Sequence, residues 1–122
     1  MSAFTSLAEA LAAEGSITRI GVAEEAGETA LSYAGMNTIQ KYFGGVKKVE
    51  LLFTLSGADT SDRQQELIDG LIEKLETLKG YKPEVEGIQD PVTSMAYPPK
   101  AVMYNGNYWI YNAGLRVACY IK

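Results

Sequence analysis

The 122-residue chain contains no histidine, a single cysteine and no apolar run near the 20 residues that a membrane-spanning helix needs. Without histidine the chain lacks the commonest general base, the commonest metal ligand and any imidazole-based triad. Cys119 has no second thiol for an internal disulfide, and one cysteine without histidine leaves no zinc-binding spacing. Carboxylates or tyrosines could still support chemistry, but we expect no enzymatic activity, no metal and no cofactor.

The chain also lacks a basic patch and the glycine motifs that cradle phosphates. Its net charge is −4 and Lys47-Lys48 is the only adjacent basic pair, so we expect no specific nucleic-acid binding. The first residues lack a basic stretch before an apolar one, so we expect no secretory signal, and the reducing cytoplasm is the natural compartment. The ordinary balance of 47% hydrophobic and 21% charged residues predicts a single globular domain over residues 1–122.

Two-residue periodicity of apolar residues is the dominant pattern in the sequence. Every odd-numbered residue from Trp109 to Ile121 is apolar, which predicts one long strand with a buried face. Asn105-Gly106 favours a two-residue hairpin turn that pairs residues 101–104 with this strand. Residues 46–56 alternate in the same way and follow the Gly44-Gly45 turn, which predicts a second hairpin.

Two segments show helical periodicity instead. Residues 2–14 carry an apolar stripe that ends at Gly15, and residues 61–79 carry a leucine and isoleucine stripe that ends at Gly80. Ser61 and Gln64 fit a capping box at the start of the second helix. Gly70 inside that helix costs about 1 kcal/mol relative to alanine, and we expect it to permit close packing on the sheet.

The remaining segments give weaker signals. We expect a short strand at residues 17–22, a loop at 24–28 and a short strand at 30–33, whereas residues 36–43 stay ambiguous. Residues 82–97 read as an edge strand or an interrupted one, and Pro98-Pro99 should stop it. The order of elements predicts an α+β fold, a two-layer sandwich of a mostly antiparallel sheet with two helices on one face.

Few side-chain groupings suggest chemistry. Glu24, Glu25 and Glu28 lack the spacing of a calcium loop and are better explained as a solvated loop. Asp59 and Asp62 flank a helix start, where capping explains both. Cys119 lies on the apolar face of the last strand, and we expect it to be a buried hydrophobe rather than a reactive thiol.

Tyrosine is the one unusual count, with eight residues. Tyr97, Tyr104, Tyr108 and Tyr120 lie near turns or on the parity opposite the apolar face of the last strand. Tyrosines are favoured in protein–protein contacts, so these four are candidate interface residues. The alternative is that they cover the sheet within the monomer.

One family shares this layout. Residues 39–55 form a glycine-turned hairpin and strand, residues 61–78 an amphipathic helix, and residues 108–121 a closing strand rich in tyrosine with Arg116 and Cys119. Over residues 37–122 the order resembles the minor capsid and tail-terminator (head–tail joining) proteins of long-tailed bacteriophages and prophages.

The resemblance implies a structural virion protein assembled in the bacterial host cytoplasm. Such proteins form a ring, typically of six subunits, which ends the tail tube and joins it to the head connector. The partners would be further copies of the chain, the tail-tube protein and the head connector protein, and an acidic lumen would let DNA pass without binding.

Two alternatives stay open. The first is a small α/β ligand-binding domain or enzyme with a pocket between helix and sheet. The second is another head-completion or tail-tube subunit of the virion.

Overall fold

The computed structural model describes residues 3–21, 23 and 25–122. Within these ranges the chain forms the following helices, 3₁₀ turns and strands: α1 (Ala3–Glu14), β1 (Arg19–Ile20), β2 (Thr29–Lys41), η1 (Phe43–Gly45), β3 (Lys47–Asp59), η2 (Ser61–Arg63), α2 (Gln64–Leu78), β4 (Gln89–Tyr104) and β5 (Trp109–Ile121).

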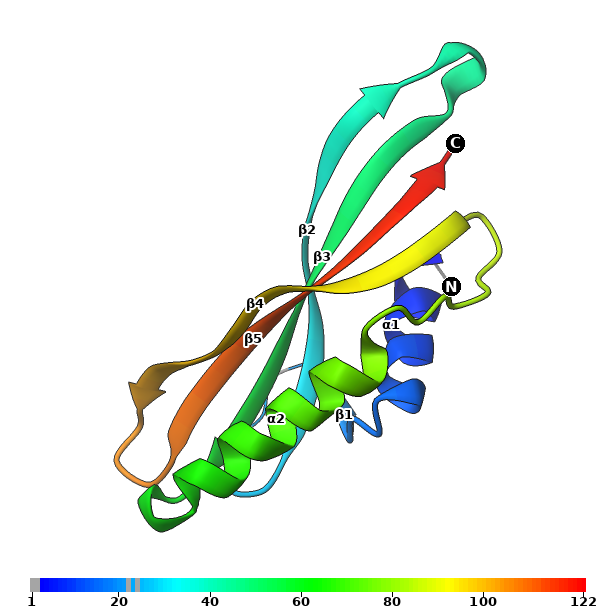
Figure 1. Cartoon of the computed structure of the whole chain (residues 1–122). Helices are drawn as coiled ribbons and strands as arrows, with labels where there is room; N and C mark the ends of the chain where they lie inside the picture. Colours follow the sequence, from blue (N-terminus) through cyan, green and yellow to red (C-terminus); the bar gives the residue numbers. More distant parts are fainter. Residues whose placement is uncertain (1–2, 22, 24) are drawn as a thin grey trace.

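The strands form one sheet in the order β1-β2-β3-β5-β4. Neighbouring strands are antiparallel except for β1 and β2, which are parallel. Both helices lie on one face of this twisted sheet, and the other face carries no helix of the described residues (Figure 1). The predicted α+β class with a mostly antiparallel sheet is confirmed.

The core lies between the helices and the odd-numbered positions of the two central strands. The closing strand runs from Trp109 to Ile121, as predicted, and its odd positions from Ala113 to Cys119 are buried. They pair with the buried odd positions of β3, and both sets pack against leucines of α1 and α2. Burying each large apolar side chain stabilises the fold by about 1.5–3 kcal/mol. The large side chains with at most 1% exposure are Leu7, Leu11, Leu31, Val49, Leu51, Phe53, Leu55, Leu71, Leu78, Leu115 and Val117.

The start of α2 differs from the predicted capping box. Residues 61–63 form a 3₁₀ turn and α2 begins at Gln64 without a side-chain cap. The Ser61 hydroxyl instead accepts a hydrogen bond from Trp109 Nε1 at 3.1 Å. Gln64 donates to the Ser61 carbonyl at 3.4 Å, so it does not return a bond to the Ser61 amide. The prediction was wrong because a distant indole binds the serine oxygen that a local cap would have used.

The prolines do not stop β4. The strand continues through Pro98-Pro99 to Tyr104, with a register shift between Tyr97 and Lys100. It is an edge strand and the prolines lie at a register shift, the two settings in which a sheet tolerates missing backbone donors. The following turn is also longer than predicted: Tyr104 pairs with Trp109, so the loop has four residues, closed by the Asn105 amide and side chain.

β2 joins two segments that the sequence separates. The predicted short strand at residues 30–33 and the ambiguous residues 36–43 become one strand, Thr29–Lys41, which pairs with β3 as the predicted hairpin. The register shifts between Tyr33 and Gly35, where Gly35 has a φ of +150°. This bulge changes the periodicity and therefore hid the strand from a two-residue pattern.

Other boundaries moved less. The helix predicted at residues 2–14 is α1, and the strand predicted at 17–22 is reduced to Arg19–Ile20; Ser2, Val22 and Glu24 lie outside the described residues.

Gly70 does not approach the sheet, because a Cβ there would meet no atom within 4 Å. The close approach is on the strand side, where a Cβ on Gly57 would lie 2.6 Å from the Cδ1 of Leu67.

Candidate interaction surfaces

The β2–β3 hairpin extends past both helices as an arm at one end of the molecule (Figure 1). β2 is buried only over its first residues, Thr29 to Leu31, and beyond Ser32 it is mostly exposed. No helix of the described residues covers the outer part of this arm (Figure 1). Its apolar side chains therefore remain in solvent.

The turn at the end of the arm holds an aromatic side chain outwards. The Tyr42 amide donates to the Val46 carbonyl at 2.8 Å, and Gly44 and Gly45 adopt φ values of +82° and +84°. Such angles favour glycine, which has no Cβ to clash. Phe43 immediately precedes the two glycines, and its relative exposure of 104% makes it fully accessible.

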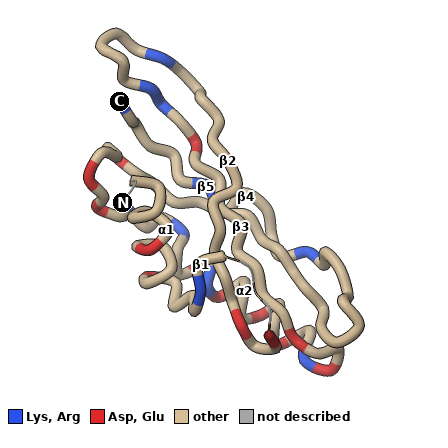
Figure 2. Tube along the Cα trace, turned by 180° about the vertical axis from the view of Figure 1, so that it is seen from behind, with Lys and Arg blue, Asp and Glu red and all other residues tan. Residues whose placement is uncertain are grey.

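We name the exposed apolar side chains of this arm, Met36, Ile39, Tyr42 and Phe43, the tip surface. Most of the charges around it are positive, and the nearby Glu50 is paired with Arg116. Lys41, Lys47 and Lys48 lie within residues 36–48, and that segment contains no carboxylate. In Figure 2 the arm carries mostly blue segments, whereas most of the red segments lie on the rest of the molecule. The arm therefore presents an apolar tip in a basic setting.

One predicted interface tyrosine lies beside the tip surface. Tyr120 on β5 has its ring centroid 6.2 Å from that of Tyr42, and Lys48 Nζ lies 6.0 Å from the Tyr120 ring. Tyr120 faces away from the helices, like Arg116, whose Nε lies 3.4 Å from Glu50 Oε2. Tyr120 thus packs beside the tip of the arm from the neighbouring strand.

The other three predicted tyrosines are dispersed. Tyr97 packs its ring on Gly114, with Lys100 Nζ 4.7 Å from the ring centroid. Tyr104 lies at the opposite end of the molecule, 5.3 Å from the Trp109 ring, and its hydroxyl donates to Gly106.

Tyr108 packs against a small cluster of three buried alanines. The members of that cluster are Ala23, Ala30 and Ala58. The four tyrosines therefore do not form one continuous surface.

A second apolar surface lies between α2 and the edge strand β4. We name it the groove; its volume is about 310 Å³. Ile72 and Met95 line it and are exposed by 40% and 49%. The other lining residues are Leu75, Glu76, Lys79, Pro98 and Pro99. An apolar cleft of this kind, rimmed by charged side chains, is typical of an interaction site.

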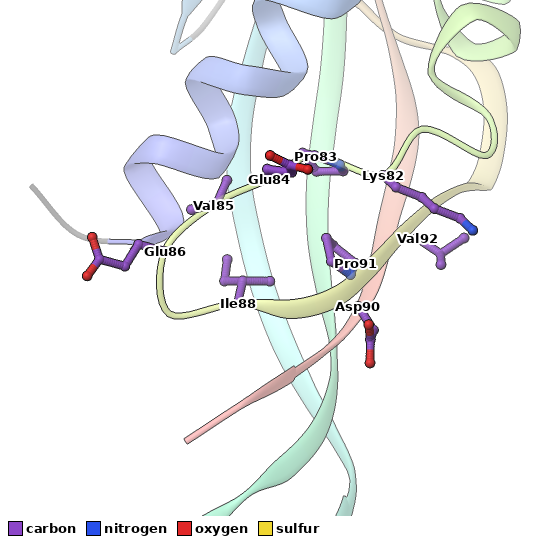
Figure 3. Close-up of a pocket in the computed structure, with 9 residues that line it drawn as sticks. All are labelled: Lys82, Pro83, Glu84, Val85, Glu86, Ile88, Asp90, Pro91 and Val92. Atoms are coloured by element: carbon purple, nitrogen blue, oxygen red, sulfur yellow. The ribbon is translucent and has the colours of Figure 1, made fainter.

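A larger hollow of about 550 Å³ is bounded by the loop before β4 and by its first residues, 82–92 (Figure 3). Pro83, Ile88 and Pro91 give it an apolar lining. The carboxylates of Glu86 and Asp90 point away from each other (Figure 3). In the described part of the chain, no group of three or more cysteine, aspartate or glutamate side chains could hold a metal ion.

The other sequence candidates have structural partners. Glu28 binds Arg19 at 2.8 Å and accepts the Glu25 amide, whereas Glu24 lies outside the described residues. The Asp59 carboxylate is buried and accepts the Thr60 amide at 2.8 Å. A hydrogen bond from the Thr60 side chain is the main cause that lowers the pKa of Asp62. The helix capping that the sequence predicted for the two aspartates is wrong, because neither the 3₁₀ turn nor α2 has a side-chain cap and both carboxylates bind Thr60 instead.

Cys119 is buried, as predicted. Burial raises the pKa of its thiol to about 11, so at neutral pH the reactive thiolate is scarcely populated.

A comparison of the sequence with protein-family models and with curated proteins finds no match. Neither described helix is both long and apolar enough to cross a membrane.

Sequence reasoning selected tyrosines and missed Phe43, Met36 and Ile39. The signal was present in Tyr42-Phe43-Gly44-Gly45, since aromatic residues directly before a double-glycine turn must lie at a hairpin tip. Whether a helix covers that tip depends on how far the strands extend past the helices, which no local pattern records.

Proposed function

We propose that this chain is a structural virion protein of a long-tailed bacteriophage or prophage, which ends the tail tube as a ring and joins it to the head connector. The observation that carries the proposal is the uncovered arm with its tip surface. Burying one large apolar side chain there would contribute about 1.5–3 kcal/mol, which gives the arm a physical reason to bind another protein surface.

The layout from residue 37 onwards supports this assignment through its resemblance to tail terminators. A ring requires a heterologous interface, in which two different patches of the same chain meet and the rotation closes. The tip surface and the groove are two such different patches. The net charge of −4 also suits a lumen through which DNA moves without adhering.

The experiment is the mass of the protein by light scattering over a series of protein and salt concentrations. A closed ring, or a distribution that rises towards one, supports the proposal. Electron microscopy of the same sample distinguishes the other virion position, because a tail-tube subunit would form open tubes rather than closed rings.

The second candidate function is binding of a small ligand. The observation in its favour is the hollow at residues 82–92, with its apolar lining of Pro83, Ile88 and Pro91. Native mass spectrometry tests it directly. A strict monomer that carries one small molecule per chain would overturn the ring proposal and favour this one.

A further inference from the structure

We propose that the tip surface of one copy docks in the groove of a second copy, head to tail. This contact rests on the proposed self-association and names the surfaces that would produce it. The occupant of the groove is a second copy of this chain, and the side chain that enters is Phe43.

The first support is the match between the two apolar surfaces. Phe43 is a fully exposed aromatic side chain at the end of an arm, and the groove is an open apolar cleft of about 310 Å³. Ile72 and Met95 on the two sides of the groove are themselves substantially exposed. One insertion would cover apolar surface on both partners at once.

The second support is charge complementarity. The arm carries Lys41, Lys47 and Lys48, whereas its carboxylate, Glu50 opposite Asn37, is paired with Arg116 at 3.4 Å, so the arm is basic on balance. α2 carries four carboxylates and one lysine. Glu76 and Lys79 both line the groove, so the excess negative charge lies along α2 beside it, where Asp69 is on the same stripe of the helix, seven residues before Glu76. Opposite charges of this kind select the orientation and partner more than they add affinity.

The third support is that the sheet edges are poorly suited to direct strand pairing between copies. On β4, Pro98-Pro99 removes two backbone donors and the register shifts. On β2, register shifts occur between Tyr33 and Gly35 and between Thr38 and Gln40. Proline and bulges are the devices that block edge-to-edge addition, so side-chain docking is the better route.

The fourth support is the position of the two surfaces. The tip lies at the end of the arm, away from α2 and the edge strand β4 (Figure 1). The groove is lined by residues of α2 and β4 on the helix-bearing side of the sheet. Two different and separated patches make a head-to-tail contact, which can close into a ring or continue as a filament, whereas a two-fold dimer would use the same patch twice.

The test is disulfide trapping between copies. Under mild oxidation, the double variant F43C/I72C should give a ladder of three or more linked copies, because each chain offers both halves of the contact. The matched control is F43C/T77C. Thr77 is also exposed on α2 but lines a separate hollow on the α1 side, with Gly15 and Ser16. The native Cys119 is buried and should stay unlinked.

Charge reversal gives a second, independent readout. Lys47→Glu and Glu76→Lys should each weaken self-association by about fivefold, and mixing the two single variants or combining them in one chain should restore part of it. Both side chains are on the surface, so thermal unfolding should change little.

The outcomes separate the contact from the function. If F43C/I72C and F43C/T77C give equal amounts of linked copies, the docking contact is overturned. It is also overturned if F43C alone forms more linked dimers than F43C/I72C forms linked copies. In either case the ring proposal survives if the wild-type chain still forms rings. A wild-type monomer with a stoichiometric ligand overturns the ring proposal itself. The absence of any linked ladder at high protein concentration also overturns the docking contact.

Discussion

The helix-covered half of the sheet and the bare arm of the β2–β3 hairpin are made from the same two strands. In the covered half, Leu31 and Leu55 pair across the strands and neither is exposed. In the arm, Ile39 and Tyr42 are also large apolar side chains but are exposed by 49% and 43%. Hydrophobicity alone therefore does not decide burial here, because the helices end before the strands do.

The covered half should not tolerate a charge. Val117→Asp is expected to unfold or aggregate the protein, because Val117 has 0% exposure and an unpaired carboxylate there would lose its solvation. Circular dichroism and solubility measure the effect. The matched control is Asn112→Asp on the same strand, which lies on the opposite, helix-free face with Lys100 as its cross-strand neighbour and should remain folded. A stable Val117→Asp variant would contradict the assignment of the core face.

The arm should behave in the opposite way. Phe43→Ser is expected to leave the unfolding temperature nearly unchanged, since the side chain is fully exposed, but to weaken self-association by more than tenfold. Thermal unfolding and light scattering on the same sample give the two readouts. Phe53→Ser, in the core, should destabilise the fold instead. Unchanged association of Phe43→Ser would remove the tip surface from the interface.

A smaller contrast concerns two glycines on facing elements. Gly57→Ala should lower the free energy of unfolding by about 1–3 kcal/mol, because the new Cβ would lie too close to the Leu67 side chain and force it to move. Gly70→Ala should instead stabilise the protein by about 1 kcal/mol, since that position is helical and has open space. Chemical denaturation measures both. Equal effects would show that the approach of α2 to β3 is looser than described.

The sequence predicted best what depends on local periodicity. The closing strand and its buried odd positions follow from alternation alone, and both helices follow from their apolar stripes. It failed where a distant group intervenes: the Trp109 indole occupies Ser61, and the free edge of the sheet lets β4 pass Pro98-Pro99. The tip surface was missed for the same reason, because its exposure depends on where two distant helices end.

The smallest expected effect tests the start of α2. Ser61→Ala should lower the free energy of unfolding by about 0.5–1 kcal/mol, through loss of the acceptor for Trp109 Nε1. A local cap would give a similar loss, so the decisive measurement is a double-mutant cycle with Trp109→Phe, followed by chemical denaturation. If the indole contact is the source, Ser61→Ala should cost almost nothing in the Trp109→Phe background. If Ser61→Ala lowers the free energy of unfolding by the same amount in that background, the capping box rather than the indole contact stabilises the start of α2.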